Sequence, residues 1–328
     1  MDKQKLDVIC NALKAESLFH IEDIQSLWSG YGTIARYGLT GAKHDSVIVK
    51  HVQLPDDANH PRGWNTDISH QRKIRSYHVE SAWYRTFADR CDASCRVPAC
   101  FYTEEGEDEF LMVLEDLDSA GFPLRNSSVS IEKMLPCLSW LASFHAHFMH
   151  QRPDGLWPVG TYWHLETRPD ELAVLTDTKL QHAAAAIDRQ LNQASFKTLV
   201  HGDAKLANFC FSGVSKAVAA VDFQYVGGGC GMKDVAYFIG SCLYEEDCER
   251  YEDKLLGYYF EQLQYFLNQQ KKQVDFDALQ TEWRCLYPLA WTDFHRFLKG
   301  WSPGHWKLNQ YSEKMAARVI AQLKDVTK

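Results

Sequence analysis

The chain has 328 residues, of which 45% are hydrophobic and 24% charged, a mixture typical of a globular protein with one large domain or two packed lobes. Its formal net charge of -8 argues against a nucleic acid or an anionic membrane as the main partner, because both bind clustered Lys and Arg. No apolar run is long enough to span a bilayer, and residues 1–18 mix acids and amides with apolar residues, so we expect a cytoplasmic protein without a signal peptide.

The first third of the chain predicts a helix followed by short strands. Apolar residues recur at helical spacing in 5–15, and the β-branched run 46–52 is typical of a buried strand. A long helix is expected over about 69–90. Residues 97–117 then predict two strands joined by an acidic turn at 104–109.

The remainder predicts mainly helices, over 131–149, over 175–194 and from 245 onward, with a β-rich island at 198–226. A small β-rich part that precedes a larger helical part favours an α+β, bilobal fold. The cleft between two such lobes is the natural place for a ligand.

The strongest chemical signal lies in the β-rich island, where HGDAKLAN occupies 201–208 and VDFQ occupies 221–224. Phosphoryl transfer needs one carboxylate to deprotonate the attacking hydroxyl, and an amide and a second carboxylate to hold magnesium on the phosphates. Asp203, Asn208 and Asp222 supply these groups, and the interval from Asp203 to Asn208 equals that of the kinase motif H-R-D-x-x-x-x-N. Each residue alone would usually be a turn or strand-end residue, but the combination favours a kinase.

These motifs resemble those of the aminoglycoside phosphotransferase and choline kinase superfamily. Within it, EDL at 115–117 before Gly121-Phe122, and DFQ at 222–224 leading through glycines to DVAYF at 234–238, are most similar to the ecdysteroid kinase-like branch. The similarity extends over about residues 50–240. It implies a bilobal protein-kinase-like fold, ATP and Mg²⁺ as cofactors, and transfer of a phosphate to a hydroxyl of a small molecule. Amino alcohols related to choline, aminoglycosides, sugars and steroid-like compounds are the candidate acceptors.

The resemblance also implies roles for single residues. Asp203 resembles the catalytic base, and Asn208 and Asp222 resemble the magnesium ligands. Lys205 stands where related kinases place a cation near the transferred phosphate, whose developing charge it would offset.

Two charged residues upstream resemble the phosphate-binding pair of kinases. Lys50 resembles the strand lysine that contacts the nucleotide phosphates, and Glu80 on the next helix resembles its ion-pair partner. The plainer alternatives are a lysine on an edge strand and a solvated helix face.

Asp234 is expected to accept N–H groups of the catalytic loop and His201 to orient that loop, neither of them acting as an acid or base.

The segment Glu115 to Leu117 resembles the kinase hinge, whose backbone N–H and C=O groups bind adenine. This interpretation ends the nucleotide-binding N-terminal lobe at 1–117 and assigns 118–328 to a catalytic and acceptor-binding C-terminal lobe.

Two groups of glycines remain to be interpreted. Gly30 and Gly32 precede Lys50 in the order expected of a phosphate-covering loop, but glycines that merely serve a hairpin explain them nearly as well. The glycine-rich run 227–231 lacks the Gly-Lys-Ser/Thr of a P-loop, and we expect a flexible turn there.

Two other functions were weighed against a small-molecule kinase. A protein kinase is disfavoured because Gly202 replaces the Arg of its motif and only eleven residues, 223–233, separate Asp222 from Asp234. A nucleotide-binding pseudokinase would have lost the base or a metal ligand, whereas every such position is filled.

The acceptor site is predicted in the aromatic-rich segment 283–306, with Asp293 as its most informative member. A cationic acceptor would gain from a carboxylate and aromatic faces. The alternative is that Asp293 pairs with Arg296 on the surface and that the aromatic residues form core.

Overall fold

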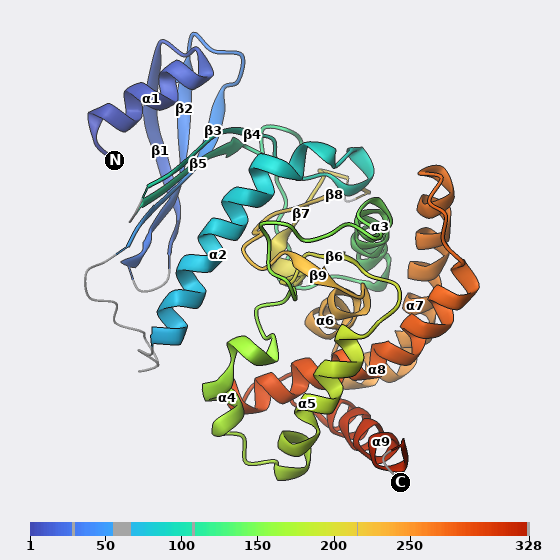
Figure 1. Ribbon diagram of the computed structural model, residues 1–328. Coiled ribbons are helices and arrows are strands. Elements are labelled where there is room, and N and C mark those ends of the chain that lie inside the picture. The colour runs from blue at the N-terminus through green and yellow to red at the C-terminus, as the bar shows by residue number, and fades with distance from the viewer. Residues whose placement is uncertain (28–29, 55–66, 107–108, 215, 327–328) are drawn as a thin grey trace.

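An antiparallel sheet forms one side of the molecule and a mostly helical part forms the other, as a computed structural model shows (Figure 1). The structure describes residues 1–27, 30–54, 67–106, 109–214 and 216–326. The chain therefore has the mixed α+β architecture that the sequence predicts. Among the described residues, no helix is both long and apolar enough to cross a membrane.

The N-terminal sheet has five antiparallel strands in the order β1-β2-β3-β5-β4. Helix α1 (Lys3–Leu13) precedes them, and the strands are β1 (Ser17–Ser26), β2 (Gly32–Thr40), β3 (Ser46–Gln53), β4 (Cys100–Glu105) and β5 (Glu109–Glu115). The β-branched run forms β3, and its apolar character follows from its central position between β2 and β5.

Alternation along β3 separates a packing face from a functional face. Val47 and Val49 are buried in one cluster with Ile9 of α1. Because successive strand residues point to opposite faces, Lys50 lies on the other face, where it meets Glu80 of helix α2 (Asp67–Thr86).

Helix α2 joins the sheet to the rest of the molecule (Figure 1). Its residue Trp83 stacks on Phe223 with ring centroids 4.5 Å apart and also contacts Phe144 and Phe148. The largest hydrophobic cluster contains residues from both sides of position 117, so the packing fixes α2 against the C-terminal part of the chain. The proposed lobe boundary at this position stays a prediction.

Most of the C-terminal part is helical, as expected. The helices are α3 (Ile131–His147), α4 (Pro169–Ala173), α5 (Thr178–Asn192), α6 (Met232–Cys242), α7 (Glu245–Gln269), α8 (Phe276–Trp301) and α9 (Gln310–Val326). Asp177 and Asp275 cap α5 and α8 by accepting the N–H groups of Leu180 and Ala278, which satisfies donors that have no partner in the first turn.

The β-rich island consists of two short antiparallel pairs, β6 (Thr198–Val200) with β9 (Gly227–Gly229) and β7 (Phe209–Phe211) with β8 (Val218–Ala220). The prediction of a flexible turn at the glycine-rich run was wrong, because Gly227–Gly229 is a strand. Its glycines allow close backbone packing: a Cβ on Gly227 would lie 2.2 Å from the carbonyl oxygen of Trp157.

Candidate active site

The loop that carries Asp203 follows β6, and Asp234 in the first turn of α6 holds its backbone. The Asp234 carboxylate accepts the N–H groups of His201 at 2.6 Å and Gly202 at 2.9 Å, and His145 Nε2 lies 3.1 Å from it. Asp234 is completely buried, so these bonds replace the water that an ionised carboxylate would otherwise bind. The bracing contacts predicted for Asp234 are therefore present.

Gly202 occupies a position that only glycine fits. Its φ of +80° is in the left-handed region, and a Cβ there would lie 2.0 Å from the carbonyl oxygen of Tyr225. The glycine allows the loop to turn tightly before Asp203.

His201 ties the catalytic loop to the end of β8. Its Nδ1 accepts the N–H of Asp203 at 3.2 Å, and its Nε2 donates to the carbonyl oxygen of Val221 at 3.0 Å. With both ring nitrogens engaged and the side chain buried against Phe223, His201 orients the loop.

The carboxylate of Asp203 is fixed by three donors. Lys205 Nζ at 2.8 Å and Asn208 Nδ2 at 3.0 Å bind Oδ2, while the hydroxyl of Tyr237 binds Oδ1 at 3.1 Å. Asn208 Nδ2 also donates to the carbonyl oxygen of Asp203 at 2.8 Å. Burial raises the pKa of Asp203, Lys205 opposes that change, and the nearby charge of Asp222 adds to it.

Asp222 follows β8 in an unusual backbone conformation. Its φ of 70° is left-handed, which costs free energy for a residue with a side chain and commonly marks a functional site. Its Oδ1 atom is buried and has no hydrogen-bond partner among the described residues. Burial alone would raise its pKa, but Lys50, Lys205 and Lys73 hold the pKa of Asp222 below the ordinary value.

The pKa values of the two aspartates therefore shift in opposite directions: that of Asp203 is raised and that of Asp222 is lowered. Such a separation suits a division of roles, in which the group with the raised pKa takes a proton and the other stays ionised.

Lys50 and Glu80 form a buried ion pair with Nζ and Oε2 2.6 Å apart. Lys50 is 4% exposed on a central strand and Glu80 is 2% exposed, so neither the edge-strand lysine nor the solvated helix face describes them. Burial raises the pKa of Glu80, an effect that the charge of Lys50 opposes.

Sequence reasoning missed Lys73, which lies two helical turns before Glu80 on α2. Its Nζ donates to Gln224 Oε1 at 2.9 Å and lies 4.7 Å from the ring centroid of Tyr77. Burial and the charge of Lys50 lower the pKa of Lys73 to about 8. The interval of seven residues from Glu80 was the available signal, because it places both side chains on one helix face.

Tyr237 is the second residue that was missed. It follows Asp234 by three residues, so one face of α6 presents both the carboxylate that holds the loop and the hydroxyl that reaches Asp203. Its hydroxyl also lies 3.2 Å from that of Tyr162. The DVAYF motif contained this tyrosine, and its helical spacing from Asp234 could have identified it.

The predicted hinge residues lie at the end of β5. Glu115 pairs with Val47 in the sheet register, its N–H donates to the carbonyl of Ala99 at 2.8 Å, and its carboxylate binds Arg96 at 2.5 Å. The Leu117 side chain is buried, and its carbonyl accepts the N–H of Phe122 at 2.8 Å. Adenine binding by this segment stays a prediction.

Gly30 and Gly32 lie where β1 turns into β2, both with positive φ. The Gly32 carbonyl accepts the N–H of Leu27 at 2.8 Å, and a Cβ on Gly32 would lie 2.0 Å from the carbonyl oxygen of His51. The hairpin alone accounts for these glycines, while a phosphate-covering role stays a prediction.

The predicted acceptor segment forms mostly core. Trp283 and Tyr287 are buried, and Trp283 donates to the carbonyl of Phe196. Asp293 binds Arg296 at 2.9 Å, and each is 1% exposed. The alternative prediction that Asp293 pairs with Arg296 was right, but the pair is buried and not on the surface as expected. Asp293 is therefore not available to an acceptor in this structure.

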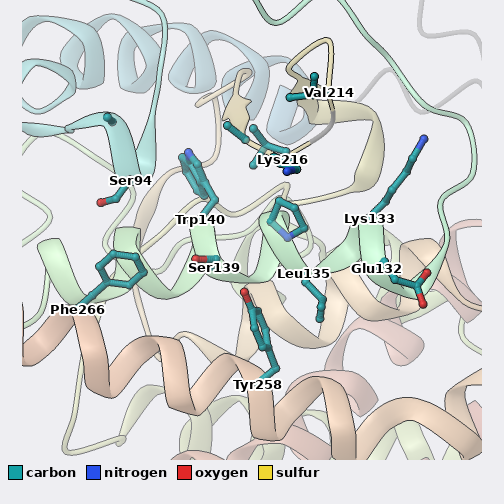
Figure 2. A pocket seen from close by; sticks show the side chains of 14 residues that line it. Ser94, Glu132, Lys133, Leu135, Ser139, Trp140, Val214, Lys216, Tyr258 and Phe266 are labelled. Atoms are coloured by element: carbon teal, nitrogen blue, oxygen red, sulfur yellow. The ribbon is translucent and has the colours of Figure 1, made fainter.

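A separate pocket of about 570 Å³ lies away from the side chains around Asp203 and Asp222 (Figure 2). Its walls come from α3, α7 and the short helix at Ala93–Cys95, together with residues next to β8, and include Trp140 and Tyr258. None of its lining residues is a predicted site residue.

The described residues contain no group of three or more His, Cys, Asp or Glu side chains placed to hold a metal. A magnesium site would instead combine Asp222 and Asn208 with nucleotide phosphates. The unpartnered Oδ1 of Asp222 fits such a cation, and Asn208 uses its amide nitrogen for Asp203, which leaves its amide oxygen as a possible ligand.

The fold, the two aspartates and the Lys50–Glu80 ion pair are arranged as in a kinase-like protein. The chain belongs to the ecdysteroid kinase-like family, whose model matches residues 38–153 and 161–272. The predicted ecdysteroid kinase-like branch and the α+β fold class are thereby confirmed. No curated protein sequence gives a significant match.

Solved structures with similarity to the chain include three small-molecule phosphotransferases. A microcompartment-associated aminopropanol kinase is 17% identical with a TM-score of 0.47, covering 96% of this chain and 94% of its own. An aminoglycoside-3'-phosphotransferase of type VIII is 14% identical with a TM-score of 0.45, covering 88% and 99%. An ethanolamine kinase from Plasmodium vivax is 10% identical with a TM-score of 0.47, covering 97% and 88%.

Proposed function

We propose that the chain is an ATP- and magnesium-dependent kinase that transfers the γ-phosphate to a hydroxyl group of a small molecule. Membership of a family of small-molecule kinase-like proteins supports the class of reaction. The observation that carries the proposal is the pair of aspartates: Asp203 is buried and has a raised pKa, and Asp222 has a lowered pKa and a buried, unpartnered oxygen.

The nucleotide would lie between the lobes 1–117 and 118–328, with its phosphates beside the cations of the cluster. Lys50, which is buried and held by Glu80, and Lys73, which is partly buried and held by Gln224, are two cations close to Asp222. Fixed cations in a desolvated site stabilise phosphate charge more strongly than mobile ones in water.

The remaining contacts to the nucleotide come from backbone groups. Those of Glu115 to Leu117 would bind adenine, and Gly30 and Gly32 would cover the phosphates. These assignments rest on the order of the segments along the chain and on their places in the sheet.

Asp222 and Asn208 are the residues that would hold magnesium. When bound, the ion would neutralise phosphate charge and fix the geometry of the phosphate chain. The positive backbone φ of Asp222 supports this role, because strain of this kind persists where it aims a functional group.

Asp203 would act at the acceptor. Because Lys205 and Asn208 occupy Oδ2, the acceptor hydroxyl would give its proton to Oδ1, whose second lone pair remains beside the bond from Tyr237. As the acceptor oxygen forms its bond to the γ-phosphorus, the bond from that phosphorus to the β–γ bridging oxygen breaks and ADP leaves with the electron pair. The products are a phosphate monoester, ADP and a proton that Asp203 releases to water.

A pseudokinase and a protein kinase are the alternatives. Every charged or amide group needed for transfer is present in one cluster, which disfavours the first. The eleven residues 223–233 include strand β9, which leaves little room for a peptide-docking segment and disfavours the second.

The direct test is ATP consumption with and without magnesium against a panel of amino alcohols, aminoglycosides, sugars and sterols, with the phosphorylated product identified by mass spectrometry. Asp203→Asn is the matched control. Phosphorylation of a panel compound by the parent but not by the variant supports the proposal. A parent that does not bind ATP would contradict it.

A further inference from the structure

Lys307, in the segment between α8 and α9, has its ammonium group inside a cage of aromatic rings. Its Nζ lies 5.0 Å from the ring centroid of Tyr237, 5.5 Å from that of Phe294 and 5.7 Å from that of Trp306. Tyr237 is the residue that donates to Asp203, so the cage adjoins the catalytic carboxylate.

No carboxylate within the described part of the chain forms an ion pair with Lys307. Burial lowers the pKa of its ammonium to about 8, with Asp203 and Cys242 raising that pKa and Lys205 lowering it. A desolvated cation without a counterion is unfavourable, and such groups are retained where a ligand completes them.

Two acids of the C-terminal part pair with arginines. Glu171 Oε1 accepts a hydrogen bond from Arg168 at 2.9 Å, while its Oε2 has no hydrogen-bond partner among the described residues, and Asp293 binds Arg296. Asp203 is needed as the base. Beside Lys307 the structure thus offers an acceptor a cation and aromatic faces.

The cage opens to solvent at Trp306, which is 45% exposed and lies 4.9 Å from the exposed ring of Tyr244. A small molecule could therefore approach Lys307 from this side. The cage is also filled by the chain's own ammonium, so a quaternary ammonium group would find its aromatic faces taken.

We propose that Lys307 determines the specificity of the acceptor site by binding an anionic group of the acceptor, so that the hydroxyl compound is an acid with an aromatic or flat apolar body. This inference rests on the proposed kinase function and deepens it. An anionic acceptor differs from choline-like compounds and aminoglycosides. Both of these are cations, and the ammonium of Lys307 would repel them.

A matched set of primary alcohols tests this proposal: 4-(hydroxymethyl)benzoate, 4-(hydroxymethyl)benzamide and 4-(aminomethyl)benzyl alcohol. They share the ring and the hydroxyl and differ only in a para group that is anionic, neutral or cationic. Binding to the full chain is measured by calorimetry in the presence of magnesium and a non-hydrolysable ATP analogue. Phosphorylation with ATP is followed by mass spectrometry.

The parent is expected to bind the carboxylate about ten-fold more tightly than the amide, and the amine most weakly, as one charged contact would give. The Lys307→Met variant should bind the carboxylate and the amide with nearly equal affinity. The Lys307→Glu variant should bind the amine more tightly than the other two compounds. Lys314→Met removes an exposed lysine on α9 and should leave the order unchanged.

The affinity for the ATP analogue shows whether Lys307 binds an anionic group of the acceptor or the γ-phosphate of the nucleotide. An unchanged affinity in Lys307→Met assigns the contact to the acceptor, whereas a loss of nucleotide affinity assigns it to the γ-phosphate and overturns the proposal. No binding of the carboxylate probe by the parent, or equal discrimination by parent and Lys307→Met, also overturns it. Failure of the parent to bind the analogue instead contradicts the proposed function itself.

Discussion

The hydroxyl of Tyr237 donates a hydrogen bond to Oδ1 of Asp203 at 3.1 Å. One turn earlier on the same helix, Asp234 accepts two backbone N–H groups of the loop that carries Asp203. Helix α6 thus holds both the backbone and the carboxylate of the proposed base.

Replacement of Asp203 by Asn should separate nucleotide binding from turnover. The amide cannot take the proton of the acceptor hydroxyl, so kcat should fall by a factor on the order of 10² to 10⁴, while affinity for ATP stays nearly unchanged. Steady-state kinetics and calorimetry measure the two quantities. Equal turnover by variant and parent would remove Asp203 from the mechanism.

Replacement of Asp222 by Asn should abolish magnesium-dependent nucleotide binding. Asn tolerates the left-handed backbone of this position, so the fold should survive, but it lacks the charge that a cation requires. Calorimetry with ATP in magnesium and in EDTA, with a melting curve as the control for folding, provides the measurement. Normal magnesium-dependent binding by a folded variant would place the metal elsewhere.

Tyr237→Phe should move the acid limb of the pH–rate profile. The tyrosine hydroxyl stabilises the ionised form of Asp203, so its removal should raise the pKa of that carboxyl further. Since the base works only when ionised, the acid limb of kcat/KM should shift to higher pH. A lower kcat with an unshifted profile would instead indicate that Tyr237 acts only through packing.

Asp234→Asn should destabilise the protein by about 2–4 kcal/mol, because an amide cannot accept both N–H groups and would present a donor to one of them. Urea denaturation measures this loss, and activity should fall with it. Asp253→Asn, an exposed acid on α7 outside this hydrogen-bond network, is the control. A variant as stable as the parent would show that the bracing bonds are dispensable.

Lys307→Met should stabilise the protein at pH 7 by about 1–2 kcal/mol, since it removes a desolvated charge. The pKa of Lys307 is about 8 in the folded protein and 10.5 as its ordinary value. Below pH 8 the ammonium of Lys307 is charged in both the folded and the unfolded chain, so the full destabilisation from burying its charge is present. Between pH 8 and 10.5 the unfolded chain binds more protons, so the stability of the parent rises and the difference from the variant disappears.

Melting curves of parent, Lys307→Met and the exposed-lysine control Lys314→Met over this pH range check that prediction. Asp203, Lys205 and Cys242 also affect the charge of Lys307, and because the variant loses these interactions together with the ammonium, they form part of the measured difference. A lower melting temperature for Lys307→Met at pH 7 would show that the ammonium stabilises the fold through its aromatic neighbours.

Local patterns in the sequence determined the elements and the catalytic motif. The β-branched run became the central strand β3, and the apolar periodicities became helices α1, α3, α5 and α7 to α9. The motif from His201 to Asn208 was predictable because its members act within one loop, where short intervals fix their relative positions. Lys50 and Glu80 followed from the order of a strand and the next helix.

Only the tertiary structure decided which other side chains join Asp203. Lys73, Tyr237 and Lys307 come from three elements, and no local interval connects all of them to the catalytic loop. The aromatic segment 283–306 shows the same limit, because a helix face that packs on core and one that faces a ligand carry the same apolar spacing. Burial of Asp293 with Arg296, and exposure of Trp306, depend on which partners the fold places opposite them.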